Sequence, residues 1–307
     1  MPNCLFCYKD AGNEEYHSRC SKRFFNTEIM PELKMDKQLL KDLAEKTISK
    51  HIAVTGVQPK LSVTLEKNTG NGRLIIVEIW GEYILKPRHE ELPAMPETED
   101  LTMHLAEIFN IAVCNHTLLR ATDGTLVYIA KRFDRANGKK VHVEDFCQLA
   151  EFPTENKYKG SYERAGKLIL AYCTNSGLDV LKYFELLLFC YLTGNNDMHL
   201  KNFSLLHLEN SIALSPAYDL LNVNLVFPKD QEELALLLNG KKKNIKLRDF
   251  EALGIVLNIP EKVRHNIYKK FKSQNTAVYE LIQASFLNAE AKDTYWEIWN
   301  KKQQIFE

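Results

Sequence analysis

A polar segment that directly follows the most apolar stretch of the chain limits the fold more than any other feature. The apolar stretch, Val180 to Leu192, contains Lys182 and Glu185 and is far shorter than the roughly 20 residues that a membrane-spanning helix needs. It therefore predicts a buried core helix. The polar run Gly194 to Asn202 comes next, and its Gly and Asn residues predict a loop.

Two strand-like runs follow this loop. They span Phe203 to Leu208 and Ile212 to Leu214, and they predict a hairpin whose second strand leads to Asp219. Within the loop, four residues separate Asp197 from Asn202, which is the spacing of a kinase catalytic loop. Each residue alone would suit a turn or a cap, but their combination with a hairpin favours a catalytic site.

These three polar residues suit phosphoryl transfer. The reaction needs a carboxylate that orients the acceptor hydroxyl and takes its proton, and it needs oxygen ligands for magnesium. We predict Asp197 as the catalytic base and Asn202 and Asp219 as Mg²⁺ ligands. Imidazole is a poor ligand for magnesium, so we expect His199 to have a structural or polar role in the loop.

Strand-like runs dominate the N-terminal half of the chain, and the sequence beyond residue 145 is mainly helical. The runs are Ala53 to Leu65, Gly72 to Trp80, Glu82 to Lys86, Val113 to Leu119 and Thr125 to Phe133. This order predicts an α+β chain in which a β-rich half, the N-lobe, is followed by a mainly α-helical half, the C-lobe. We expect a Cys-rich N-terminal arm at 1–30, the N-lobe at 31–133 and the C-lobe at 134–307.

Composition is typical of a globular protein and does not indicate a binding partner. The 307 residues are 45% hydrophobic, which suits a buried core, and 40 basic residues balance 40 acidic ones, so no net field favours direct binding to nucleic acid or a membrane. The run Lys241 to Lys243 predicts a solvated turn. Residues 1–10 lack the pattern of an export signal, and seven cysteines, an odd number, fit a reducing compartment better than a disulfide framework.

A lysine and a glycine-containing turn in the N-terminal half predict nucleotide contacts. Lys86 ends an apolar strand, where it could clamp phosphates, and either Glu97 or Glu99 on the next helix could orient it. The chain has no GxGxxG or Walker motif, which counts against an ordinary protein kinase or P-loop enzyme. The turn around Gly56 can still offer backbone N–H groups to phosphate, together with the Lys60 side chain.

Four soft or borderline ligands lie near the N-terminus. Cys4 and Cys7 have CxxC spacing, and His17 and Cys20 have HxxC spacing, which together suit a tetrahedral zinc site. A short arm with little core would gain stability from such a metal. The alternative is a metal-free arm with reduced thiols, because the second CxxC of a full zinc ribbon is missing.

Seven blocks occur in the order found in HipA-type toxin kinases, and the chain resembles that family over residues 50–245. The blocks are Thr55 to Lys60, Ile84 to Pro87, Lys131 to Arg135, His142 to Gln148, Asn196 to Phe203, Pro216 to Asp219 and Glu233 to Lys241. The resemblance implies a two-lobed kinase-like fold that uses ATP and Mg²⁺ to phosphorylate serine on itself and on an aminoacyl-tRNA synthetase, which halts translation. It also implies a DNA-binding HipB-like antitoxin as partner.

The resemblance assigns roles to residues as well. It implies Asp197 as the base, Asn202 and Asp219 as magnesium ligands, and Lys86 as the ATP lysine. Further ATP contacts are expected at Lys60, Gly56, Val57, Gln58, Lys131, Phe133 and His199, with backbone groups of Lys131 and Phe133 beside the adenine.

The chain departs from the family in two ways. It is shorter at its N-terminus than full-length HipA toxins, so it is similar to the shorter HipT variety, which can work with a separate small HipS-like protein. Ala53 stands where many relatives carry an autophosphorylated serine. Either Thr55 takes over, or regulation differs, or the position was altered.

Two other classes of function compete with a toxin kinase. A pseudokinase would use nucleotide only as a structural ligand while it sequesters a partner, but the complete set of Lys86, Asp197, Asn202 and Asp219 argues against it. A kinase of small molecules or lipids is the second alternative, because no acceptor pocket can be read from the sequence. The site of action stays open too, since the protein could be delivered to another cell.

Overall fold

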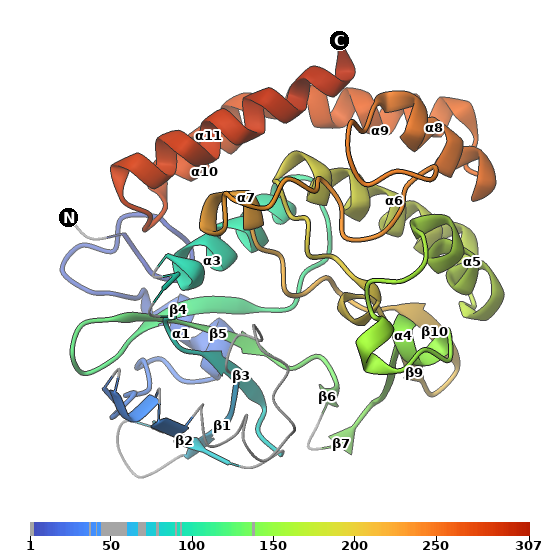
Figure 1. Cartoon of the computed structure of the whole chain (residues 1–307). Helices are drawn as coiled ribbons and strands as arrows, with labels where there is room; N and C mark the ends of the chain where they lie inside the picture. The colour runs from blue at the N-terminus through green and yellow to red at the C-terminus, as the bar shows by residue number, and fades with distance from the viewer. Residues whose placement is uncertain are drawn as a thin grey trace. The chain divides into compact units, whose positions relative to one another are not determined.

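A computed structural model describes residues 3–36, 38–40, 42–43, 60–66, 72–77, 80–89, 91–92, 94–136 and 139–307. The chain divides into two units, labelled by element in Figure 1. The sheet unit contains Met1–Leu101, Cys114–Arg132 and Ala284–Leu287, and the helical unit contains Thr102–Val113, Phe133–Gln283 and Asn288–Glu307. The predicted positions Ala53, Thr55, Gly56, Val57 and Gln58 lie outside the described residues.

An antiparallel sheet of five strands forms the centre of the sheet unit, in the order β2-β1-β3-β5-β4. Its strands are β1 (Leu61–Glu66), β2 (Arg73–Ile76), β3 (Tyr83–Lys86), β4 (His116–Arg120) and β5 (Leu126–Lys131). Every predicted strand-like run contributes one of them. In β3, Tyr83 and Leu85 point into the core, and the register pairs Lys86 with Tyr128 of β5.

The N-terminal segment packs on this sheet. Helix α1 (Ser18–Phe25) places the rings of Phe24 and Phe25 5.6 and 5.8 Å from the ring of Tyr83. Leu5, with 1% of its surface exposed, belongs to the same hydrophobic core as the strand residues. The segment expected to be an arm before the main fold therefore contributes side chains to the core of the sheet unit.

Helix α3 (Met95–Ile108) begins in the sheet unit and ends in the helical unit, and the acidic Glu97 in its first turn matches the helix dipole. The other helices of the helical unit are α4 (Phe146–Leu149), α5 (Tyr162–Tyr172), α6 (Ser176–Leu192), α7 (Val223–Val226), α8 (Leu247–Val256), α9 (Glu261–Ser273), α10 (Asn275–Ala284) and α11 (Ala289–Gln303). Short 3₁₀ turns lie at Thr154–Asn156, Leu200–Asn202 and Gln304–Phe306.

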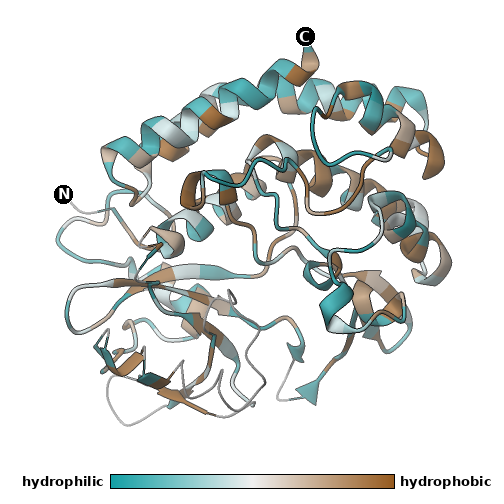
Figure 2. Ribbon diagram, viewed as in Figure 1, coloured by the Kyte–Doolittle hydropathy of each residue, from teal (hydrophilic) through white to brown (hydrophobic). Residues whose placement is uncertain are grey.

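The apolar stretch at 180–192 is a buried helix, as predicted. It forms most of α6, and Figure 2 shows that α6 is largely hydrophobic whereas α11 is mostly hydrophilic. Phe109, just after α3, stacks on Phe271 of α9 at 4.3 Å and lies 5.9 Å from Phe189 of α6. Aromatic packing thus joins three helices around one core.

The predicted hairpin is present and gains a third strand. Strands β9 (Ser204–Leu208) and β10 (Ser211–Leu214) pair antiparallel, and β8 (His142–Asp145) pairs with the other edge of β9. The sequence did not indicate β8. A small ribbon of β6 (Arg135–Ala136) and β7 (Lys139–Lys140) precedes it.

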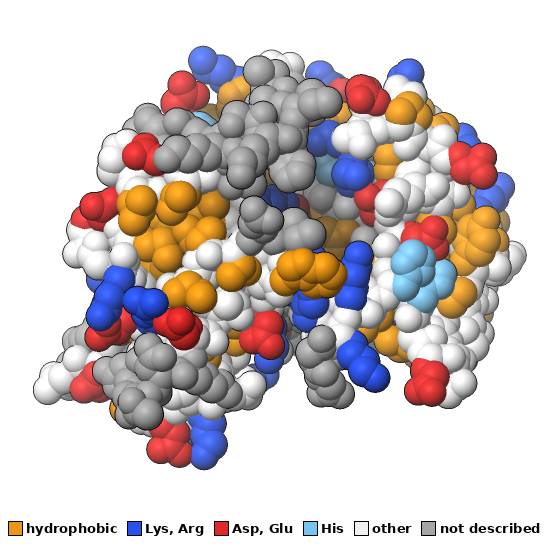
Figure 3. All heavy atoms as spheres, turned by 90° about the horizontal axis from the view of Figure 1, so that it is seen from below, with side chains coloured by type: hydrophobic (Ala, Val, Ile, Leu, Met, Phe, Trp, Pro, Cys, Tyr) orange, Lys and Arg blue, Asp and Glu red, His pale blue; other side chains and the backbone are white. Residues whose placement is uncertain are grey.

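The surface agrees with the balanced composition. Figure 3 shows acidic and basic side chains scattered together over the face that it draws. In the part of the chain that the structure describes, no helix has both the length and the apolar character needed to cross a bilayer. Lys241, in the run predicted to be a solvated turn, is 34% exposed at its side chain and donates to the buried carboxylate of Asp249 at 2.7 Å.

Candidate active site

The end of α6 sets the position of the predicted catalytic loop. Gly194 has a φ of +67°, and a Cβ atom there would lie 2.8 Å from Asn224 Oδ1. Only glycine adopts this left-handed conformation at such close approach without strain. The backbone N–H of Asn195 then donates to the Cys190 carbonyl at 2.8 Å, which turns the chain away from the helix.

The Asp197 carboxylate lies in this loop and has a defined partner. The Tyr158 hydroxyl donates to Asp197 Oδ1 at 2.6 Å. On the backbone side, the Asp197 N–H donates to the amide oxygen of Asn195 at 3.3 Å, and the Tyr162 hydroxyl donates to the Met198 carbonyl at 3.1 Å. The loop is therefore held on both sides of the predicted base.

Asn202 faces the same loop. Its Nδ2 donates to the Asp197 carbonyl at 3.0 Å, and its side chain is buried, with 8% of the residue exposed. Because the amide nitrogen is engaged in this way, Oδ1 is the atom that remains to accept or to coordinate. Magnesium prefers oxygen ligands, so the orientation of Asn202 fits the predicted metal role.

Asp219 follows strand β10 and a short parallel bridge between Ala217 and Val113. Its φ is +56°, a left-handed conformation that is uncommon for a residue other than glycine and is often found at functional sites. The Tyr218 hydroxyl donates to the Lys201 carbonyl at 2.9 Å, which ties this segment to the catalytic loop. Asp219 thus lies near the loop, as the hairpin predicts.

His199 is buried between these groups, with 6% of its surface exposed. Burial lowers the pKa of its imidazole, the nearby Lys157 charge lowers it further, and the carboxylates of Asp197 and Asp219 act in the opposite direction. Its ring meets that of Tyr158 edge to face at 5.0 Å.

The sheet unit carries the predicted ATP lysine. Lys86 Nζ lies 2.5 Å from Glu99 Oε1, and the two side chains are only 5% and 2% exposed. Of the two glutamates that could orient Lys86, Glu99 is therefore the one that pairs with it. Glu97 instead lies 3.9 Å from Arg88, and burial raises the pKa of its carboxyl.

The remaining predicted ATP contacts are scattered along the chain. Lys60 is exposed just before β1. The Lys131 N–H donates to the Asn115 carbonyl at 2.7 Å, so this group is already engaged within the sheet unit. Phe133, in the helical unit, packs its ring against that of Tyr218 at 5.4 Å.

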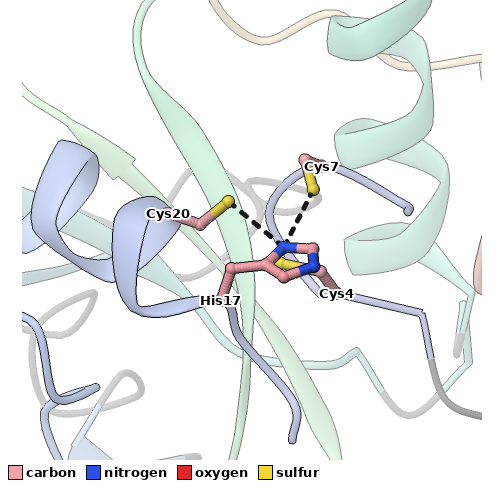
Figure 4. Close-up of side chains that lie close together, drawn as sticks. All are labelled: Cys4, Cys7, His17 and Cys20. Carbon is pink, nitrogen blue, oxygen red and sulfur yellow. Dashed lines mark hydrogen bonds between the residues drawn. The ribbon is translucent and has the colours of Figure 1, made fainter. Parts of the chain in front are cut away.

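The four N-terminal ligands are brought together (Figure 4). His17 Nδ1 lies 3.5 Å from Cys7 Sγ and 3.6 Å from Cys20 Sγ, and the ligand atoms of all four residues lie within 4.8 Å of one another. Burial and the neighbouring Cys4 and Cys7 sulfurs raise the pKa of Cys20 to about 12. Burial acts to raise the pKa of Cys4 as well, but hydrogen bonds, the strongest from the His17 backbone, outweigh it and lower that pKa.

Sequence reasoning missed Tyr158. It precedes Asp197 by 39 residues and lies in an irregular segment with no periodic pattern, so nothing in its surroundings indicates a contact with the loop. A second missed contact joins Lys201 of the loop to Asp145 at the end of β8, with Nζ 2.9 Å from Oδ2. Asp145 also caps α4, which fixes its carboxylate.

Two kinases are similar in sequence to part of this chain. The chain is 33% identical over 205 residues to the candidate kinase Y4dM of Sinorhizobium fredii, covering 62% of this chain and 49% of that protein. It is 26% identical over 214 residues to the serine/threonine-protein kinase toxin HipA of Shewanella oneidensis, covering 62% and 47%. The chain thus spans about half the length of these relatives.

The fold is similar to a solved structure. HipA of Shewanella oneidensis, in complex with HipB and its operator DNA, superposes with a TM-score of 0.67 at 23% identity, over 83% of this chain and 64% of that one. This likeness confirms the predicted α+β, kinase-like fold. A family model described as the HipA-like C-terminal domain matches residues 52–279. The chain therefore belongs to the HipA-like C-terminal domain family.

Proposed function

We propose that this protein is an ATP- and Mg²⁺-dependent serine/threonine protein kinase. The observation that carries the proposal is the loop in which Asp197 and Asn202 are joined by a 3.0 Å hydrogen bond, with a carboxylate held by Tyr158 and an amide oxygen left to coordinate. Membership of the HipA-like family supports it. The intact set of polar residues supports transfer over a pseudokinase that only binds nucleotide.

Each residue has a defined task in this proposal. Asp197 accepts the proton of the acceptor hydroxyl, and the side chains of Asn202 and Asp219 would hold magnesium, whose charge offsets that developing on the transferred phosphoryl group. Lys86 would contact the ATP phosphates. Its pairing with Glu99 keeps the ammonium group in one orientation inside a buried environment.

Replacing Asp197 by Asn tests the assignment of the base. The change keeps the size of the side chain but removes the group that accepts the proton, so transfer of labelled phosphate from ATP should fall by about 10²–10⁴-fold. The control is Asp293→Asn, at an exposed position of α11. Transfer by the Asp197 variant at the rate of the unchanged chain would refute the role of base.

The finer proposal is that the kinase is the toxin of a toxin-antitoxin system in the bacterial cytoplasm. Its support is the similarity to a kinase toxin named HipA and to a HipA solved with HipB. We propose that its substrate is an aminoacyl-tRNA synthetase and that phosphorylation of this enzyme inhibits translation. We propose a HipB-like antitoxin as one partner and, as in the shorter HipT variety, a small HipS-like protein as a second partner. Incubation with labelled ATP and cell extract, followed by phosphopeptide identification, tests whether the substrate is a protein. Labelling of small molecules alone would contradict a protein substrate.

A further inference from the structure

The N-terminal ligands have the spacing of a tetrahedral metal site. For zinc bound to sulfur at about 2.3 Å and to nitrogen at about 2.05 Å, a tetrahedral angle places the two ligand atoms about 3.6 Å apart. His17 Nδ1 lies 3.5 Å from Cys7 Sγ and 3.6 Å from Cys20 Sγ, and Cys4 Sγ completes the group (Figure 4). The side chains converge on one point from two separate backbone segments.

The histidine is oriented as a metal ligand. His17 Nε2 lies 2.9 Å from the Asp10 carbonyl, which can only accept, so the ring proton belongs on Nε2. Nδ1 is then left with a lone pair directed at the sulfur atoms. A hydrogen bond from the second ring nitrogen to a backbone carbonyl is the usual partner of a metal-bound histidine.

Backbone hydrogen bonds and helix α1 fix the two segments that carry the ligands. The Cys4 N–H donates to the Lys9 carbonyl at 2.8 Å, and the Tyr8 N–H donates to the Cys4 carbonyl at 2.9 Å, which closes a tight turn around the CxxC pair. His17 is the N-cap residue of α1, and Cys20 lies in its first turn, so both face the same side of that helix.

We propose that Cys4, Cys7, His17 and Cys20 bind one Zn²⁺ ion as a closed structural site. Three sulfur ligands and one imidazole form one of the standard sets for structural zinc. All seven cysteines of the chain are free, and a disulfide within the group would engage only two sulfurs and leave the oriented imidazole without a role. Four protein ligands leave no open position, so the ion would not take part in catalysis.

The site would fasten the N-terminal segment to the sheet. The carbonyl of Leu5, inside the CxxC turn, accepts from the Thr117 hydroxyl of β4 at 3.0 Å, and the Tyr16 hydroxyl lies 2.7 Å from the same hydroxyl. Phe24 and Phe25 of α1 pack on β3, which ends in Lys86. Zinc would therefore join the CxxC turn, which is hydrogen-bonded to β4, to the helix that packs on β3, the strand carrying this lysine.

The metal content of the full chain, purified under reducing conditions without chelator, tests the proposal. We expect one zinc per chain by mass spectrometry, and replacement by cobalt(II) should give the visible absorption of a tetrahedral thiolate site. Removal of zinc by a chelator should lower the melting temperature. Less than about a fifth of an equivalent of zinc per chain, together with no cobalt spectrum, would overturn the assignment. Both measurements use the unchanged chain, so they do not depend on whether a variant folds.

Two variants locate the ion. A second group of metal-binding side chains, His142, Glu144 and His207, lies in the helical unit. We expect Cys7→Ser to lose stoichiometric zinc and His207→Ala to retain it. Zinc retained by Cys7→Ser and lost by His207→Ala would place the ion at the second group and refute the N-terminal site. None of these outcomes depends on kinase activity, so the zinc site and the proposed function are tested independently.

Discussion

The contact between Tyr158 and Asp197 gives the catalytic loop a feature that the spacing of its polar residues does not contain. A phenol that donates to one carboxylate oxygen at 2.6 Å leaves the other oxygen to face an acceptor hydroxyl. Burial, together with the adjacent Asp197 carboxylate, raises the pKa of Tyr158, so its hydroxyl keeps the proton that it donates. The tyrosine therefore positions the base and does not compete for its proton.

Replacing Tyr158 by Phe should lower kcat by about 10- to 100-fold, with the KM for ATP unchanged. Loss of a hydrogen bond to a charged group costs roughly 1.5–3 kcal/mol, and about 1.4 kcal/mol corresponds to tenfold in rate. The effect should fall on kcat because the tyrosine acts on the base and not on the nucleotide. Steady-state phosphorylation kinetics provide the measurement.

The matched control for this variant is Tyr172→Phe, an exposed tyrosine on α5. It removes the same hydroxyl from the same unit without touching the loop, and we expect unchanged kcat. A Tyr158 variant that is as fast as the control would show that the carboxylate needs no such partner.

At the scale of elements, the turn that ends α6 determines where the catalytic loop starts. Gly194 accepts backbone hydrogen bonds from Val223 at 3.1 Å and Asn224 at 3.2 Å, so α7 approaches the glycine closely. Any side chain at this position would have to adopt a left-handed conformation and displace Asn224. The loop and α7 can occupy these places only while residue 194 has no Cβ.

Gly194→Ala should therefore lower the free energy of unfolding by about 1–3 kcal/mol and reduce kcat, because the strain falls at the start of the catalytic loop. Gly177→Ala, in the first turn of the same helix, is the control. A Cβ there meets nothing within 4 Å, so this change should be neutral or stabilising by up to about 1 kcal/mol. Denaturant unfolding of both variants measures the difference, and equal effects would contradict the role assigned to Gly194.

Much of the fold could be predicted because its elements carry local patterns. Apolar runs with turn residues between them indicated the strands of the sheet and the hairpin of β9 and β10, and the apolar stretch 180–192, interrupted by Lys182 and Glu185, indicated a core helix. Strand β8 could not be predicted, since three of its four residues are polar and none is buried, and only its pairing with β9 makes it a strand. A short edge strand has no pattern of its own.

The choice between two glutamates shows what the sequence cannot settle at the site. Glu97 and Glu99 are two residues apart in α3, so they point to different sides of the helix and only one can meet Lys86. Which one does depends on the rotation of the helix against the sheet, and this is set by core packing. Lys241 is a similar case, because its partner Asp249 is recognised only once α8 is in place.

At the scale of the whole molecule, the two units divide the predicted residues. Lys86 and Glu99 belong to the sheet unit, and Asp197, Asn202 and Asp219 belong to the helical unit. Removing one member of a buried ion pair costs about 3–5 kcal/mol because the other charge is left uncompensated. A test of nucleotide binding through Lys86 must therefore separate loss of the contact from loss of stability.

Ligand-induced stabilisation makes this separation. ATP with Mg²⁺ at 100 times its dissociation constant should raise the free energy of unfolding by about 2.7 kcal/mol, seen as a higher melting temperature. Lys86→Met should melt lower and lose this shift. In Lys86→Met combined with Glu99→Leu neither charge of the pair remains, so the melting temperature should recover while the shift stays absent. A full nucleotide-induced shift in the double variant would show that Lys86 does not bind ATP.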